Sequence, residues 1–374
     1  MQWANAAADE DGRVRSGFYM ENAHRPARVP AEHSETAYLT NRAIETIDAI
    51  GDKPWCLHLS YIKPHWPYLA PAPYHALYRG ADVPPALKSE AERADPHPIY
   101  AAFMKLGVAQ CLSDDAKRAH ILPAYLGLIK QVDDELGRLF AHLEAKGLSD
   151  NTLIALTADH GDYFGDHWLG EKDLFHDPSV KIPLIIYDPS TEADPTRGKV
   201  CTDLTAAIDL IPTFLESLGS EIPDHRLEGQ SLLRFIRQQR AIERPVVFTE
   251  SDYARLPVST MLDQDPYRAR MTMAFDGRYK FVHCPGYRPI LFDLANDPSE
   301  FVDLGADPGY ASIREQLKDQ MLDWSATLKN RAAVSSAMQT EYKGKSARQG
   351  ILIGFWSPDE VPENRRLPAQ LGLS

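Results

Sequence analysis

The stretch NTLIALTADHGDYFGDHWLGEKD, residues 151–173, decides the fold of this chain and suggests its chemistry. Its apolar run leads into an acid and an imidazole, Asp159 and His160, which are followed directly by Gly161. A lone lysine, Lys172, comes thirteen residues after the acid. This order predicts a buried strand that ends in two metal ligands, and a loop that carries a cation back over them. The chemistry that it suggests is attack on a tetrahedral oxyanion ester, either a sulfate or a phosphorus ester.

The pattern around this stretch predicts an α/β domain. The chain has 374 residues, above the size at which single cores tend to split, so we expect one main domain and one smaller one. Strands alternate with helices up to residue 243, which favours a mostly parallel sheet flanked by helices over residues 1–243. We expect helices at 35–50, 121–146 and 204–218, and strands at 55–61, 152–157 and 182–187. Residues 80–118 are charged, and we expect a surface excursion there.

The pattern changes after residue 243. Short apolar runs at 246–249, 272–275, 279–283 and 291–294 predict strands, and Asp276-Gly277 is typical of a hairpin turn. A helix is predicted at 310–329. We therefore expect a small antiparallel α+β subdomain at 244–330. The tail, 331–374, is polar except for ILIGFW at 351–356, which we expect to dock on its own chain or on a neighbouring subunit.

Composition excludes several classes of protein. Hydrophobic residues make up 44% and charged residues 25%, which is ordinary for a soluble globular protein. The net charge of −13 argues against nucleic acid as a partner. No apolar run approaches the length of a membrane span, and the amino terminus lacks the apolar region of a secretory signal. The four cysteines form no CxxC pair, so we expect reduced thiols, a cytoplasmic location, and Cys56 buried within the run WCLHL.

Asp159 and His160 are the candidate metal ligands. Open sheets present functional groups at the carboxyl ends of their strands, and this pair follows such an end. A carboxylate and an imidazole suit a divalent cation such as Ca²⁺ or Mn²⁺, although these ions prefer about six ligands and the sequence offers no clear source for the rest. The alternative is an aspartate that caps a turn beside a surface histidine. Gly161, the strand and Lys172 favour the metal site.

His65 and Lys172 are the candidate catalytic residues. His65 lies in KPHWP, where two prolines stiffen the backbone and fix the direction of the imidazole. It is placed to protonate a leaving oxygen or to bind the transferring group, or else it stacks on Trp66. Lys172 would neutralise the nonbridging oxygens, or else it is a solvated lysine in an acidic loop. Lys63 is a lesser candidate, and the sequence contains no GxSxG elbow, P-loop or HExxH motif.

Several blocks of the chain resemble the sulfatase and phosphonate monoester hydrolase group of the alkaline phosphatase superfamily. The blocks are TADHGDYFGDH, KPHWP, AIDLIPTFLESLG, LEGQSLL and LFDLANDPSE, in the order of that group and spread over most of the chain. The KPHWP and GDHWLGEKD blocks look most similar to those of phosphonate monoester hydrolases.

The resemblance implies a fold and a set of roles. The fold would be an alkaline-phosphatase-like sheet flanked by helices, with a small antiparallel carboxyl-terminal domain. Asp159 and His160 would bind a divalent metal, and His65 and Lys172 would contact the transferring group and the leaving oxygen of a small anionic ester. Members of this group are often oligomers, so we expect a homo-oligomer.

One part of the group's pattern is not found in this sequence. The group begins with a strand that carries an acidic metal-ligand pair, and then presents a Cys or Ser in C/S-x-P-x-R, with the Cys matured to formylglycine. The nearest match, Cys284 in CPGYR, has its proline one place too early and lies in the predicted hairpin region, so we interpret Cys284 as structural. The chain resembles a hydrolase without its first third and its N-terminal strands, and we expect it to be inactive or impaired alone.

Two other functions remain open. The chain is alternatively a non-catalytic remnant that acts as a binding or structural protein. A phosphomutase or nucleotide phosphodiesterase of the same superfamily fits less well, because the extra histidine ligands of those enzymes are not found here.

Overall fold

The computed structural model describes residues 23–329 and 334–342, and the ILIGFW segment with its expected oligomer contact lies outside them. The chain forms two compact units, one from residues up to Arg197 together with Pro245–Met321, the other from Gly198–Arg244 together with residues from Leu322 onward. The three-part division expected from the sequence stays a prediction.

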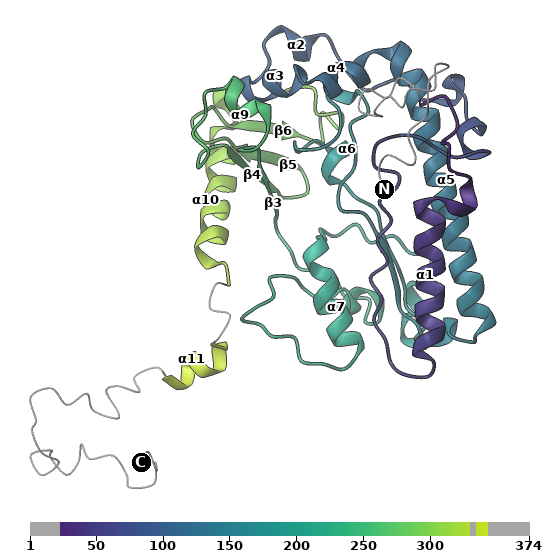
Figure 1. The fold of residues 1–374 in the computed structure, drawn as a ribbon. Coiled ribbons are helices and arrows are strands. Elements are labelled where there is room, and N and C mark those ends of the chain that lie inside the picture. Colours follow the sequence, from purple (N-terminus) through teal and green to yellow (C-terminus); the bar gives the residue numbers. More distant parts are fainter. Residues whose placement is uncertain (1–22, 330–333, 343–374) are drawn as a thin grey trace, which may run out of the picture. The chain divides into compact units, whose positions relative to one another are not determined.

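Two long helices lie side by side in the first unit (Figure 1). Helix α1, Glu35–Ile50, begins at Ser34, whose hydroxyl accepts the amide of Ala37, and it ends at Gly51 with φ of 63°. Helix α5, Asp115–Ala145, begins six residues before the helix predicted at 121–146 and ends one residue before its end. Their apolar sides meet through four buried residues: Ala43, Ile47, Leu139 and Leu143.

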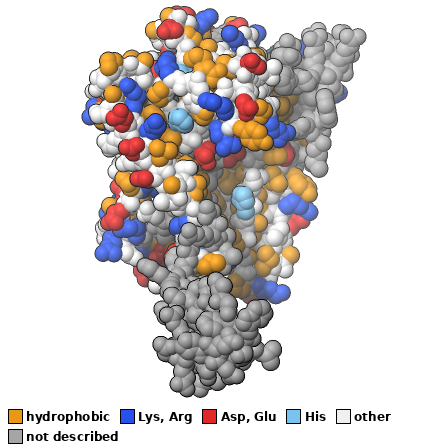
Figure 2. All heavy atoms as spheres, turned by 90° about the vertical axis from the view of Figure 1, so that its left-hand side faces the viewer, with side chains coloured by type: hydrophobic (Ala, Val, Ile, Leu, Met, Phe, Trp, Pro, Cys, Tyr) orange, Lys and Arg blue, Asp and Glu red, His pale blue; other side chains and the backbone are white. Residues whose placement is uncertain are grey.

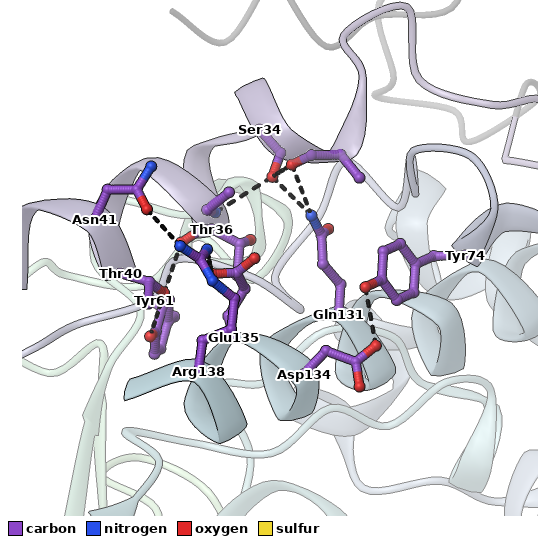
Figure 3. A network of polar contacts seen from close by, with 12 residues as sticks. Ser34, Thr36, Thr40, Asn41, Tyr61, Tyr74, Gln131, Asp134, Glu135 and Arg138 are labelled. Carbon is purple, nitrogen blue, oxygen red and sulfur yellow. Dashed lines mark hydrogen bonds and ion pairs between the residues drawn. The ribbon is translucent and has the colours of Figure 1, made fainter. Parts of the chain in front are cut away.

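Polar contacts also join α1 to α5 (Figure 3). The side chain of Gln131 donates to the hydroxyl of Ser34 at 2.6 Å, and Arg138 donates to Asn41 at 2.8 Å. On the same helix, Thr40 shares a 2.8 Å hydrogen bond with the hydroxyl of Tyr61. The contact from Tyr61 anchors the segment before the KPHWP loop to α1.

The first sheet is antiparallel. Strands β1, Ile154–Thr157, and β2, Leu184–Tyr187, pair in opposite directions, from Ile154 opposite Tyr187 to Thr157 opposite Leu184. The expected parallel pairing is therefore wrong for these strands. A parallel pair needs a crossover connection, usually a long helix, whereas the loop between β1 and β2 contains only short turns and helix α6, Asp177–Val180.

Residues 55–61 are extended but pair with no other described strand. Their side chains still alternate: Leu57 and Leu59 pack against the α1–α5 cluster, whereas Cys56 and His58 are exposed. The segment thus has the alternating burial that was predicted for a strand, but it does not pair with a described strand. The expectation that Cys56 is buried is wrong, because the alternation turns it away from the helices.

The segment 80–118 is folded rather than a surface excursion. It contains helices α2, Ala91–Ala94, α3, Pro98–Met104, and α4, Gly107–Ser113. Ile99 and Phe103 are buried because their spacing of four places both on one side of α3.

The second sheet confirms the predicted antiparallel carboxyl-terminal subdomain. Its strands follow chain order: β3, Val247–Asp252, β4, Arg270–Phe275, β5, Tyr279–His283, and β6, Ile290–Asp293. One face packs against α10, Ala311–Thr327, through Leu317 and Met321. The other face packs against the loop that follows β1, through Tyr163 and Phe175. The short helix α9, Pro257–Met261, lies between β3 and β4 in the sequence.

A buried ion triad ties this sheet to α6. The ammonium of Lys280, on β5, contacts the carboxylates of Asp177 at 2.7 Å and Glu300 at 2.5 Å. A buried charge is costly unless it is paired, so these two acids account for the lysine in the core.

The second unit contains α7, Leu210–Ser217, and α8, Leu233–Ile236, and its later residues include α11, Ser336–Tyr342. The helix predicted at 204–218 begins later than expected, since buried Asp209 pairs with Arg244 instead of continuing a longer helix. Among the described helices, none combines the length and the apolarity needed to cross a bilayer.

Candidate metal and oxyanion site

Asp159 and His160 lie just beyond the end of β1, separated from it by Ala158. The Nδ1 of His160 lies 2.7 Å from the carbonyl oxygen of Gly161, so Nδ1–H donates there and Nε2 keeps its lone pair. This Nε2 lies 3.5 Å from Oδ2 of Asp159, whose side chain is 88% exposed. A nitrogen and an oxygen donor thus open together towards solvent, and this donor set fits a divalent cation.

The pair provides only part of a metal site. Within residues 23–329 and 334–342, no cluster of three or more His, Cys, Asp or Glu side chains has an arrangement suited to a metal. Ca²⁺ takes six to eight oxygen-rich ligands, and Mn²⁺ sites are typically octahedral. Asp159 and His160 therefore fit a metal, but they do not complete its coordination.

The imidazole of His65 is held from both sides. Its Nδ1 lies 2.9 Å from the carbonyl oxygen of Trp66, and its Nε2 lies 3.0 Å from Nζ of Lys172. Since an ammonium can only donate, Nε2 accepts and Nδ1–H donates, which makes the ring neutral. Burial lowers the pKa of His65, the hydrogen bond to Trp66 opposes this shift, and the positive charge of Lys172 adds to it.

The loop after β1 brings Lys172 back towards the histidines, as the sequence predicts. The ring centroids of His65 and His160 lie 6.0 Å apart, so His65 meets both Lys172 and His160. Asp159 joins this group through His160. The structure thus gathers all four candidate residues from two segments that are far apart in the sequence. Lys172 is half-buried and bonded to His65, which differs from the solvated lysine that was the alternative.

Two acids flank the lysine. Burial raises the pKa of Glu171 and of Asp173, and the charge of Lys172 opposes both shifts. Both acids have a positive φ, which holds this turn in an uncommon conformation.

A tyrosine–aspartate contact, which the sequence did not reveal, joins the two loops of the site. The hydroxyl of Tyr68 donates to Asp162 at 2.5 Å, and the amide of Phe164 donates to the same carboxylate at 3.0 Å. Burial raises the pKa of Asp162 to about 6, although both hydrogen bonds act in the opposite direction. The only signal in the sequence was that each residue lies just after a motif, KPHWP or DHG.

Cys284 lies immediately after β5 and is buried. Burial raises the pKa of its thiol to about 12, so the sulfur stays protonated at neutral pH. These features fit the structural role predicted for it.

Comparison with known proteins shows to which family the chain belongs. A sequence model described as Sulfatase matches residues 1–220, more than half of the chain. The chain belongs to the sulfatase family. A second model, described as "N-sulphoglucosamine sulphohydrolase, C-terminal", matches residues 165–327.

Similar proteins agree with this sulfatase assignment. The chain is 34% identical over 346 residues to the "Multifunctional alkaline phosphatase superfamily protein PehA" of Trinickia caryophylli, covering 87% of this chain and 65% of that protein. It is 28% identical over 230 residues to an "Arylsulfatase" of Clostridium perfringens, covering 60% of this chain and 47% of that protein.

Among solved structures, the "Phosphonate monoester hydrolase SpPMH from Silicibacter pomeroyi" has a TM-score of 0.78 and 30% identity, with 89% of this chain and 67% of that chain covered. The phosphonate monoester hydrolase of Agrobacterium radiobacter has a TM-score of 0.74 and 30% identity, with 81% of this chain and 62% of that chain covered. The predicted sulfatase and phosphonate monoester hydrolase group and the alkaline-phosphatase-like α/β fold are confirmed. The chain spans 65% or less of the length of these curated relatives.

Proposed function

We propose that this sulfatase-family chain forms part of a metal-dependent hydrolase of sulfate or phosphonate/phosphate monoesters. Asp159 and His160 would hold a divalent cation, Ca²⁺ or Mn²⁺, and His65 and Lys172 would contact a small anionic ester. The observation that carries the proposal is the 3.0 Å contact between His65 and Lys172 beside the ring of His160. This contact supports the proposal because it joins a cation and a neutral imidazole beside the two proposed metal ligands.

The residues have distinct tasks in this proposal. The ammonium of Lys172 offsets negative charge on the nonbridging ester oxygens. His65, with a lone pair on Nε2, orients that ammonium in the free protein. When the ester is bound, Nε2 takes up a proton from water and donates it to the leaving oxygen, which restores the neutral ring. A divalent cation, when bound, polarises the ester oxygens.

The nucleophile is not among these residues. The sulfatase family generally uses a formylglycine, and the sequence of this chain contains no C-x-P-x-R motif from which one is made. Removing a nucleophile costs about six orders of magnitude in rate in other hydrolases. We therefore propose that these 374 residues alone have little or no turnover.

A second candidate is a non-catalytic sulfatase-like protein with a binding or structural role. The small number of metal donors among the described residues favours it. For either candidate we propose a homo-oligomer in the cytoplasm, and the lack of a CxxC pair in the sequence supports a reducing compartment.

Calorimetric titration with Mn²⁺ and with Ca²⁺ tests the metal site. We expect Asp159→Asn and His160→Gln each to weaken binding of one of these ions at least about tenfold. Asp150→Asn, a change at an exposed acid away from the site, serves as the control and should bind like the original chain. Binding that neither site variant weakens would contradict the metal site.

Assays of hydrolysis with an aryl sulfate and a phenylphosphonate ester test the activity. Turnover by the 374-residue chain would refute the proposed impairment and support catalysis by residues present here. Specific metal binding without turnover is the result expected from the incomplete set of catalytic groups.

A further inference from the structure

We propose that Lys63 is a positioning residue that sets the direction of the His65 imidazole by bonding to the backbone carbonyls of His65 and Pro67. The inference deepens the proposed function, since it concerns the same site, and it rests on that function only for its catalytic meaning. The geometry itself is independent of any activity.

The ammonium of Lys63 bridges the KPHWP loop. Its Nζ donates to the carbonyl oxygen of His65 at 3.0 Å and to that of Pro67 at 2.9 Å. The carbonyl of Trp66 lies between these two in the chain, and it is the group that accepts Nδ1–H of His65 at 2.9 Å. By fixing the peptide units on either side, Lys63 fixes the acceptor that orients the ring.

The sequence of the loop favours a side-chain donor at this place. Two of the five residues in KPHWP are prolines, which have no backbone N–H to donate. The carbonyl of Pro67 accepts the amide of Leu69 at 2.9 Å, and Lys63 adds a second donor to it and a donor to the carbonyl of His65. A lysine ammonium supplies three N–H groups from one position.

The burial of Lys63 favours a specific role over a general contribution to stability. Its residue is only 7% exposed, and its ammonium donates to the two loop carbonyls. Burial lowers its pKa to about 8, with the charge of Glu35 opposing the shift. A buried cation costs free energy that an apolar side chain of similar length would avoid. The hydrogen bonds from the lysine to the loop offset this cost.

The surroundings of Lys63 hold it in place. Two residues earlier, Tyr61 is tied to Thr40 of α1, as Figure 3 shows. A small cavity of about 10 Å³ is lined by Lys63, Glu35 and Gln131, the last of which belongs to the same network between α1 and α5. The base of the lysine is therefore anchored to the helices while its ammonium reaches the loop.

The test uses nitrogen NMR of the His65 ring in the full 374-residue chain. In the original chain we expect a single tautomer, with the proton on Nδ1. Lys63→Met keeps the length of the side chain but removes the donors, and we expect a mixture of the two tautomers. Lys63→Gln keeps amide donors without a charge and should retain more of the Nδ1–H form than Lys63→Met. Lys53→Met, at an exposed lysine, is the matched control and should leave the ring unchanged.

The outcomes separate this inference from the proposed function. Equal tautomer populations in Lys63→Met and Lys53→Met would overturn the positioning role, whatever the activity. If Lys63→Met does not fold, the original chain still decides: a through-bond coupling across the hydrogen bonds from Nζ to the carbonyl carbons of His65 and Pro67 is expected, and its absence would contradict the inference. If the chain shows a single Nδ1–H tautomer but binds no metal, the result supports the positioning role of Lys63 and contradicts the proposed metal-dependent hydrolase.

Discussion

His176 shows how one buried side chain links stability to pH. Its ring stacks on that of His167 with centroids 3.9 Å apart, and its Nδ1 lies 3.1 Å from the hydroxyl of Tyr163. Nδ1 of His167 in turn lies 2.7 Å from Glu92. Burial lowers the pKa of His176 well below its ordinary value of 6.5, and the charges of His167 and Lys280 act in the same direction. His176 is therefore neutral in the folded chain.

We expect acid to destabilise the fold through this residue. Because the pKa of His176 is lower in the folded chain than in the unfolded one, the unfolded chain gains a proton first as the pH falls below about 6.5. One such proton changes the free energy of unfolding by about 1.4 kcal/mol per pH unit. In denaturant titrations between pH 7 and pH 5, His176→Phe should lose less stability than the original chain, while His58→Gln, at an exposed histidine, should not differ from it. An equal loss in His176→Phe would contradict this account.

At the residue scale, the sequence located the four candidate site residues but not their supports. Asp159 and His160 follow a strand end, His65 follows a proline, and Lys172 lies in the loop after the same strand; such local patterns can be recognised within one stretch of sequence. The bond from Tyr68 to Asp162 joins residues 94 positions apart, and the two contacts of Lys63 depend on the path of a loop. These supports follow from tertiary packing, which one-dimensional patterns do not contain.

At the scale of elements, the loop that carries Asp159 and His160 lies against the backbone of α6. The amide of Gly161 donates to the carbonyl oxygen of Ser179 at 2.7 Å. A Cβ atom at Gly161 would lie 1.9 Å from the carbonyl oxygen of Pro178. The glycine after Asp159 and His160 is thus needed for close approach of two backbones.

Gly161→Ala should therefore destabilise the chain. Overpacking of this kind costs about 1–3 kcal/mol, because backbone atoms cannot move aside as a flexible side chain would. Gly137→Ala is the matched control: it lies on an exposed side of α5 with no atom near the added methyl, and it should be neutral or stabilising by about 0.5–1 kcal/mol. Thermal and denaturant unfolding of both variants gives the measurement. Equal stability of Gly161→Ala and the original chain would mean that the loop can shift away from α6.

The predicted elements agree best with the structure where their signals are local. Helix α1, its glycine cap and the hairpin of β4 and β5 lie where capping and turn residues indicate. The pairing direction of β1 and β2 was predicted wrongly, since pairing depends on partners elsewhere in the chain. The segment 55–61 shows the same limit. Its alternating burial could be predicted from the sequence, whereas its lack of pairing with a described strand could not.

At the scale of the whole molecule, the surface contains exposed apolar positions on the first sheet and before the KPHWP loop. Ile62, Ile185 and Tyr187 are 54%, 64% and 39% exposed, and the nearby segment 55–61 pairs with no described strand. By contrast, the face drawn in Figure 2 mixes acidic, basic and apolar side chains. Unpaired backbone beside apolar side chains is a site of edge-to-edge association.

We therefore expect the chain to self-associate in solution. Sedimentation velocity over a range of concentrations should show species larger than a monomer, and Ile185→Lys should shift the distribution towards the monomer because a charge on an edge disfavours pairing. Val302→Lys, at an apolar residue in a loop that is 55% exposed, is the control and should leave the distribution unchanged. A monodisperse, cooperatively melting monomer at every concentration would contradict the expectation.

The ion triad of Lys280, Asp177 and Glu300 limits where the chain can be cut and which of its parts can be exchanged with those of a relative. Asp177 opens the helix that Gly161 touches, and Lys280 belongs to the carboxyl-terminal sheet. Cutting the chain near residue 244 would leave Asp177 on one piece without its cation, while Lys280 and Glu300 stay together on the other. If the carboxyl-terminal subdomain were exchanged between family members, the hybrid should be stable only when all three residues of the triad are present. We therefore expect changes in α6 and in the carboxyl-terminal sheet to be coupled during evolution.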